Sequence, residues 1–137
     1  MQPRFRAYGL ATQMTEEKRA FDRIEIDYSI RIIGEDGSNA PAIATNISMT
    51  GMQILCDTPT MQVITPHGVE TKPDQEVMVH VRVLLTDMPS HESTLGLFAR
   101  VVVVRATGPD EYRIGIHFTD YEPGSYDALE HYIDAHL

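Results

Sequence analysis

The feature that most limits the fold is an alternation of apolar and polar residues that recurs along the chain. In residues 24–32 every second position is apolar: Ile24, Ile26, Tyr28, Ile30 and Ile32. The residues between them are polar or charged, and a period of two is typical of a β-strand with one buried face. Residues 77–85 repeat the pattern with valine and leucine. Both segments are therefore predicted to be half-buried strands.

Four more segments favour strands. Turn residues lie between residues 24–32 and 40–47 and again between residues 95–106 and 112–118. The segments are residues 40–47, 52–55, 95–106 and 112–118. The sequences Gly34-Glu35-Asp36-Gly37 and Thr107-Gly108-Pro109-Asp110 contain the glycine and proline that favour tight turns. About six antiparallel strands of this kind suit a small barrel, because closure leaves no exposed edge. The sequence predicts a mainly β fold, a small six-stranded antiparallel barrel.

The spacing of apolar residues changes at the end of the chain. Apolar residues three or four positions apart mark residues 125–137: Tyr126, Leu129, Ile133 and Leu137. This spacing is typical of an amphipathic helix. We predict a C-terminal α-helix that packs over one opening of the barrel.

Two segments lack a regular pattern. Residues 57–76 contain three prolines and a glycine, which favours a long loop, with a short strand at residues 61–64 as the alternative. Residues 86–94 are predicted to form a second loop.

Length and charge restrict the classes of function. The 137 residues suit one domain, and a single cysteine excludes an internal disulfide. No apolar run approaches the roughly 20 residues that span a bilayer, and no secretory signal is evident, so we expect a cytoplasmic protein without membrane insertion. The net charge of −9 argues against a nucleic acid polymer as partner, because polymer binding needs a broad basic face. A small anionic ligand stays compatible with this charge.

Residues 1–17 have few regularly spaced apolar positions, so we expect a flexible N-terminal tail, followed by one domain at residues 18–137. Arg19 and Arg23 stand four residues apart where this tail leads into the first strand. Guanidinium is planar, always charged, and forks onto phosphate or onto guanine O6 and N7. The pair predicts an anion and guanine site, although most such pairs in proteins are solvated surface residues.

A second polar motif follows at Asn46-Ile-Ser48-Met-Thr-Gly51. If Asn46 and Ser48 share a strand, their side chains face one side and can reach one ligand. Gly51 then supplies a left-handed or closely approached backbone position. The alternative is a polar turn that closes a hairpin, since Asn, Ser and Gly favour turns for local reasons. Later in the chain, Gly115 faces away from the apolar side of its strand and indicates close approach of backbone or ligand.

Other chemistry has little support in the sequence. The six histidines lack the paired spacing of a zinc site. Nucleophile elbows and phosphate-binding glycine loops are also absent from the sequence. Nothing in the sequence argues for catalysis.

Together, in this order and spacing, the two motifs resemble those of the PilZ domain, the bacterial receptor module for cyclic di-GMP (c-di-GMP). The family pattern is Arg-x-x-x-Arg, a strand, then Asp/Asn-x-Ser-x-x-Gly, and it appears here as Arg19-Ala-Phe-Asp-Arg23 and Asn46-Ile-Ser-Met-Thr-Gly51. Residues 112–118 and the terminal helix are similar to the end of the family's domain. The resemblance covers residues 18–137 and implies a split barrel with a C-terminal helix.

The resemblance also implies roles for the motif residues. Arg19 and Arg23 are expected to hold guanine edges and phosphates, Asn46 and Ser48 to bind a guanine edge, and Gly51 to keep the backbone close to the ligand.

Asn46 stands where many family members have Asp. An amide lacks the charge that favours guanine N1–H and N2–H, so the affinity is expected to be lower. Lys18, next to Arg19, is expected to add a phosphate contact.

The implied function is a bacterial c-di-GMP receptor, with no metal or further cofactor, that regulates biofilm formation or motility. We expect ligand to order the N-terminal arm of a monomer or weak dimer, which then signals to an unidentified protein partner. The alternative is a protein-interaction module of the same fold with little or no nucleotide binding. A hydrolase that uses residues 57–76 as a lid is a third hypothesis, but it lacks a catalytic constellation.

Overall fold

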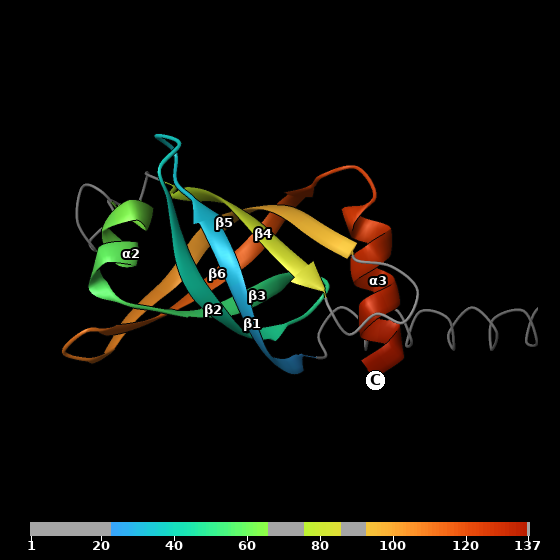
Figure 1. Ribbon diagram of the computed structural model, residues 1–137, viewed down its shortest axis with the longest axis horizontal. Coiled ribbons are helices and arrows are strands. Elements are labelled where there is room, and N and C mark those ends of the chain that lie inside the picture. The colour runs from blue at the N-terminus through green and yellow to red at the C-terminus, as the bar shows by residue number, and fades with distance from the viewer. Residues whose placement is uncertain (1–22, 66–75, 86–92, 137) are drawn as a thin grey trace, which may run out of the picture.

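The structure is a computed structural model that describes residues 23–65, 76–85 and 93–136. It contains six strands, which are β1 (Ile24–Ile33), β2 (Asn39–Ile47), β3 (Gly51–Cys56), β4 (Met78–Leu85), β5 (Ser93–Gly108) and β6 (Glu111–Tyr121). The described helices are α2 (Thr58–Ile64) and α3 (Ser125–His136). Figure 1 shows the strands wrapped into a barrel, with α2 at one end and α3 at the other.

The six strands form a closed barrel in the order β1-β2-β3-β6-β5-β4, and every neighbouring pair is antiparallel. The pairing of β1 with β4, in which Ile30 is opposite Val83, closes the ring. Closure pairs the edge strands with each other. The predicted fold class, a mainly β six-stranded antiparallel barrel with a C-terminal helix, is confirmed. The last hairpin is longer than predicted, because β5 and β6 continue to the turn at Pro109.

The alternating apolar residues fill the barrel. In the second half of β1, Ile30 and Ile32 are buried, whereas Ser29 and Arg31 are exposed. The predicted alternation of β1 is therefore confirmed. Other strands add buried side chains to the same core, including Ile54, Val81, Leu97 and Ile114.

The prediction of a loop or short strand after residue 57 is wrong for residues 58–64, which form α2. Asp57 caps this helix, because its carboxylate accepts a hydrogen bond from the Thr60 amide at 3.0 Å. Pro59 lies in the first turn, where a missing amide hydrogen costs nothing. Proline thus marks a helix start here, and Met61 and Ile64 of α2 enter the barrel core.

The helix α3 buries Leu129 and Ile133, as predicted, but it buries Tyr132 in place of Tyr126. Leu129, Tyr132 and Ile133 face the core, whereas Tyr126 is 48% exposed. The Tyr132 ring contacts the Tyr28 ring of β1 edge to face, with centroids 6.2 Å apart. The helix ends at His136, so the predicted contribution of residue 137 lies outside the described residues.

Glu122 and Ser125 attach the start of α3 to the barrel. The Glu122 amide donates to the Gly96 carbonyl, and the Gly96 amide donates to Ser125 Oγ, both at 2.9 Å. The Glu122 carboxylate also contacts His80 at 3.1 Å and Arg82 at 3.2 Å. These contacts, that of His80 first, lower the pKa of Glu122. A side chain on Gly96 would overlap this carboxylate and would displace it from its present position.

In the part of the chain that the structure describes, no helix has the length and apolar character needed to cross a membrane.

Candidate functional site

One cavity is lined by Arg23 and by residues of strands β2, β3, β6 and β5. Its volume is about 300 Å³, and its lining consists of Arg23, Asn46, Gln53, Val103, Arg105, Arg113 and Gly115. The strand register explains why these residues meet. Asn46 pairs with Gln53, Gln53 with Gly115, and Gly115 with Val103, so one row crosses β2, β3, β6 and β5.

Arg23, just before β1, extends this row through two hydrogen bonds. One terminal nitrogen of Arg23, Nη1, donates to Asn46 Oδ1 at 2.9 Å. Asn46 Nδ2 in turn donates to Gln53 Oε1 at 2.9 Å. We call these three residues the Arg23–Asn46–Gln53 chain. It holds the arginine against the strands before any ligand is present.

Arg105 and Arg113 face each other across β5 and β6 as directly opposite residues. Like charges in this arrangement are destabilising. Within the described residues, neither guanidinium forms a hydrogen bond or an ion pair. An unpaired arginine pair at a cavity that also holds Arg23 is typical of a site for an anion.

The described arginines outside the cavity have partners instead. Arg31 donates to Asn39 Oδ1 at 2.8 Å, Arg82 pairs with Glu122, and Arg100 lies 3.6 Å from a Glu76 oxygen. Among the described arginines, those without a partner therefore both line the cavity.

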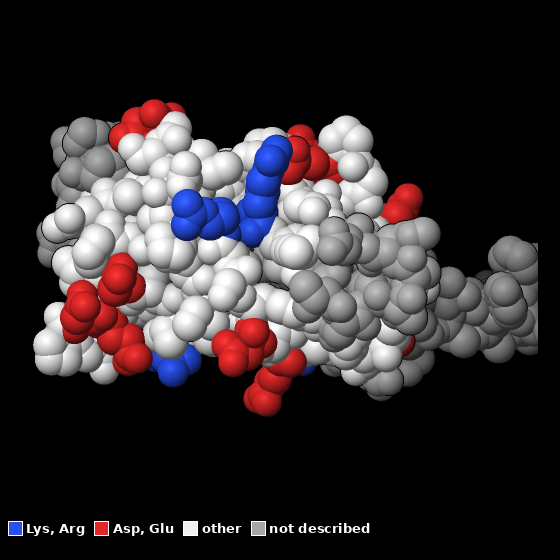
Figure 2. Space-filling model, viewed as in Figure 1, with Lys and Arg blue, Asp and Glu red and all other residues white. Residues whose placement is uncertain are grey.

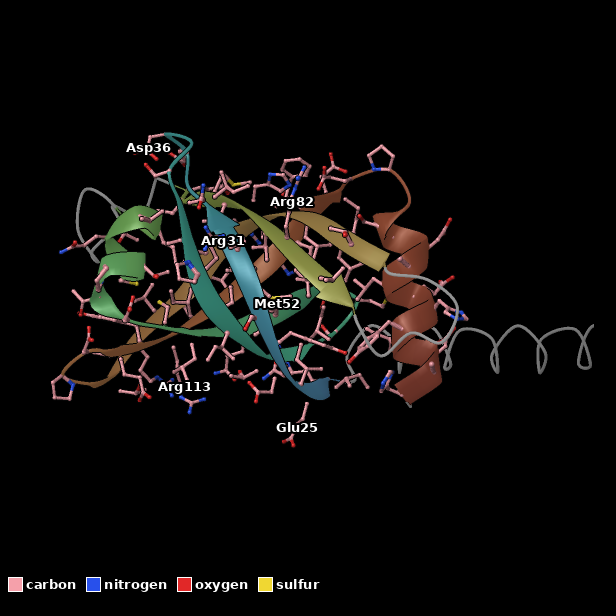
Figure 3. All side chains as sticks on the ribbon, in the orientation of Figure 1. Glu25, Arg31, Asp36, Met52, Arg82 and Arg113 are labelled. Atoms are coloured by element: carbon pink, nitrogen blue, oxygen red, sulfur yellow. The ribbon has the colours of Figure 1, made fainter. Side chains whose placement is uncertain are left out.

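The figures show where this charge lies on the molecule. The face in Figure 2 is mostly uncharged, with basic side chains near its centre and acidic side chains toward its margin. In the same orientation, Figure 3 labels Arg31 and Arg82 near the centre and Arg113 at the lower edge. The cavity thus opens on a different side of the barrel from the Arg31–Arg82 face.

Gly115 forms part of the cavity wall, and packing does not require a glycine there. A Cβ atom on Gly115 would lie 3.5 Å from the Val103 Cβ, an ordinary van der Waals contact. Any side chain would instead take up space in the cavity. The structure shows no close approach of backbone at Gly115, and close approach of a ligand stays a prediction for this position beside Arg113 and Gln53.

Ser48 lies elsewhere, and the expectation that it shares a strand face with Asn46 is wrong. The strand β2 ends at Ile47, so Ser48 belongs to the turn that leads into β3. Its side chain is buried, and Oγ accepts hydrogen bonds from the Thr50 and Gly51 amides, each at 3.2 Å. The alternative, a polar turn closing a hairpin, describes this segment.

Gly51 supplies the close backbone approach that the sequence indicated, but toward β6. Its backbone is not left-handed, since the described glycines with positive φ are Gly37 and Gly124. A Cβ atom on Gly51 would clash with the Ile116 carbonyl oxygen. The glycine therefore allows β3 to pair with β6 where the strand begins.

Replacing Gly51 by alanine is expected to lower the free energy of unfolding by about 1 to 3 kcal/mol, the usual cost of forcing extra atoms into a packed site. Urea denaturation followed by circular dichroism measures the loss. Gly115→Ala is the matched control, because the added methyl group there meets only ordinary contacts. Equal stability of wild type and Gly51→Ala would contradict the predicted clash.

The structure brings together Arg23, Asn46 and Gly115 of the predicted site residues, while Lys18 and Arg19 lie outside the described residues. Sequence reasoning missed Gln53, Arg105 and Arg113. Arg113 carries one usable signal, because it stands two positions before Gly115 and therefore shares its strand face. Gln53 and Arg105 become recognisable only through the register.

Other reactive groups do not add to the site. Among residues 23–65, 76–85 and 93–136, no three His, Cys, Asp or Glu side chains converge as metal ligands would. Burial raises the pKa of the Cys56 thiol to about 11, so it is protonated at neutral pH.

Comparisons with known proteins agree with this architecture. A family model described as PilZ domain matches residues 17–135. Curated protein sequences gave no match. Among solved structures, the Bacillus subtilis inhibitor of motility, MotI/DgrA, is similar with a TM-score of 0.61 and 14% identity over 82% of this chain. The chain spans 48% of that protein's length.

Two separate PilZ domains are matched almost over their full lengths. The PilZ domain of CeSA from a cellulose-synthesizing bacterium has a TM-score of 0.54 and 19% identity, with 83% of this chain and 96% of that chain covered. The PilZ domain of Escherichia coli YcgR, solved with c-di-GMP, has a TM-score of 0.56 and 14% identity, with 87% and 91% covered. At these identities the structural likeness shows the fold, whereas the family model covers most of the sequence. The chain therefore belongs to the PilZ domain family.

Proposed function

We propose that this protein is a cytoplasmic receptor for c-di-GMP that acts by binding and not by catalysis. The observation that carries the proposal is the convergence of three guanidinium groups, those of Arg23, Arg105 and Arg113, on one cavity of an otherwise acidic chain. A small anion fits such a site, because a few arginines create local positive potential without a broad basic face. The c-di-GMP bound to the YcgR domain of the same family has this chemistry.

The donors around the cavity suit both parts of this ligand. Guanidinium groups donate to phosphate oxygens and, in pairs of hydrogen bonds, to guanine O6 and N7. Arg105 and Arg113, which have no partner among the described residues, are proposed to neutralise phosphate. Arg23, held toward the strands by Asn46, is proposed to meet a guanine edge.

The cavity takes up part of a dinucleotide. Its volume of about 300 Å³ is at the lower limit of the roughly 300 to 1,000 Å³ typical of ligand pockets. The remainder of c-di-GMP is proposed to contact Lys18 and Arg19, which precede Arg23 in the chain and lie outside the described residues.

Asn46, Ser48 and Gly51 are proposed to contribute in different ways. Asn46 lines the cavity and can reach ligand directly. Ser48 and Gly51 act indirectly, because the Ser48 hydroxyl fixes the turn that sets the start of β3. Ser48→Ala is thus expected to weaken binding by altering the turn that connects Asn46 to Gln53.

We further propose that ligand orders the arm that carries Arg19 and that a partner protein recognises the ordered arm. The arm sequence lacks a strand or helix pattern, whereas Asn46, Gln53 and Gly115 lie on barrel strands. A ligand that bridges the two must offset about 1 to 2 kcal/mol of conformational entropy per residue fixed.

Hydrogen exchange measured by mass spectrometry tests the ordering of the arm. Deuterium uptake in residues 1–23 is expected to fall when c-di-GMP saturates the full chain, while peptides from α3 serve as the internal control. Full protection without ligand, or unchanged uptake at saturation, would contradict ordering of the arm as the signal.

Isothermal titration calorimetry of the full chain with c-di-GMP, beside GTP, tests the proposed function. Saturable heat with c-di-GMP and much weaker binding of GTP is the expected result. Absence of binding at millimolar c-di-GMP would overturn the proposal and would favour the protein-interaction module.

A further inference from the structure

The hydrogen-bond directions in the Arg23–Asn46–Gln53 chain follow from the chemistry of its first member. Guanidinium only donates hydrogen bonds. The Asn46 atom at 2.9 Å from Arg23 Nη1 must therefore be the carbonyl oxygen Oδ1. The Asn46 amide nitrogen is then the atom that faces Gln53.

The same reasoning fixes the orientation of Gln53. Asn46 Nδ2 is a donor, so the Gln53 atom 2.9 Å away must be the acceptor Oε1. The other end of the side-chain amide is the Nε2 group, which has two hydrogens to donate. Nε2 has no hydrogen-bond partner within the residues that the structure describes, and Gln53 lines the cavity.

The cavity consequently presents donors and few acceptors. Arg23, Arg105 and Arg113 cannot accept a hydrogen bond, and both oxygens of the chain, Asn46 Oδ1 and Gln53 Oε1, already accept one. A purine edge that offers two acceptors fits this wall, and guanine O6 and N7 provide them. Adenine would bring its N6 amino group, a donor, against donors.

We propose that Gln53 is a specificity-determining residue whose Nε2 group donates a hydrogen bond to the guanine edge of the ligand. The inference rests on the proposed function, since it assigns a residue to the same cavity. Gln53 selects guanine because its amide polarity is set by Asn46, which is itself set by Arg23. The three residues thus act on the base through one ordered set of hydrogen bonds.

The substitution Gln53→Glu tests the direction of the amide with little change of shape. Glutamate keeps an oxygen that accepts from Asn46 Nδ2, but it replaces the donating Nε2 group by a second acceptor. The added negative charge weakens the binding of every anionic nucleotide. The informative quantity is therefore the ratio of the affinities for c-di-GMP and c-di-AMP. Loss of the guanine contact lowers that ratio, whereas a general charge effect leaves it unchanged.

Competition of both dinucleotides against a fluorescent c-di-GMP derivative measures this ratio in the full chain. We expect Gln53→Glu to reduce the preference for guanine about tenfold or more, as for loss of one hydrogen bond to a base edge with a repulsive contact in its place. Gln53→Met, which removes both polar atoms, is expected to reduce the preference as well. A thermal unfolding curve confirms that each variant is folded.

The outcomes separate the two proposals. Binding of c-di-GMP by wild type with an unchanged ratio in a folded Gln53→Glu protein overturns the role of Gln53 and leaves the receptor function intact. No c-di-GMP binding by wild type overturns both. A ratio that falls in Gln53→Glu and Gln53→Met supports the proposal.

Discussion

Replacement of Arg23 by alanine is expected to weaken c-di-GMP binding about ten- to a hundredfold, because a charge-assisted or bidentate contact contributes about 1.5 to 3 kcal/mol. The substitution also removes the hydrogen bond that fixes Asn46 Oδ1. We expect losses of affinity in the same range for Arg113→Ala and Arg19→Ala. Isothermal titration calorimetry gives each dissociation constant.

Arg31→Ala is the matched control for this series. Arg31 is a β1 arginine, exposed to solvent and hydrogen-bonded to Asn39, but it is not part of the cavity lining. Its removal changes net charge by the same amount as removal of Arg23. Similar losses for Arg31→Ala and Arg23→Ala would show that the effect is general electrostatics, and unchanged affinity in Arg23→Ala and Arg113→Ala would exclude the cavity.

A preference for c-di-GMP over c-di-AMP of a hundredfold or more is the second large effect that we expect. Each good bidentate contact to a base discriminates by about 1 to 3 kcal/mol, and the ligand carries two bases. The two dinucleotides have the same cyclic sugar–phosphate backbone, so the difference between their affinities isolates recognition of the base edge. Equal affinities would mean that the arginines bind phosphate alone.

The sequence was sufficient to predict the barrel because the strand signal is local. Every buried residue of β1 stands two positions from the next, and the same period marks β4. The C-terminal helix was also predicted, together with its buried residues Leu129 and Ile133, but burial of Tyr132 was not. Tyr126 and Tyr132 are both tyrosines at helical spacing from Leu129 and Ile133, so spacing alone does not show that Tyr132 is buried and Tyr126 is exposed.

The helix α2 was missed for a different reason. Several prolines in one segment favour a loop, but Pro59 follows the helix cap Asp57 and stands where proline is favoured in a helix. Residues 66–75, which carry the remaining prolines of that segment, lie outside the described residues.

The candidate site was partly predictable, because its two motifs are short and carry recognisable polar residues. Arg23 and Asn46 were predicted together and hydrogen-bond in the structure. Gln53 and Arg105 join them through strand pairings whose register no local pattern fixes. Ser48 was assigned to a strand face because no local pattern shows that β2 ends at Ile47. The Ser48 hydroxyl accepts hydrogen bonds from the Thr50 and Gly51 amides, and these bonds form a turn there.

Chemical-shift mapping by NMR tests most directly whether the arginine-lined cavity is the c-di-GMP site. In a titration of the ¹⁵N-labelled full chain, the account predicts saturable shifts at the amides of Asn46, Gln53, Val103 and Gly115, all in the cavity wall. The amides of Arg31 and Leu84, on another side of the barrel, are predicted to stay unchanged. Shifts confined to the Arg31–Leu84 side, or no shifts at millimolar c-di-GMP, would contradict the account.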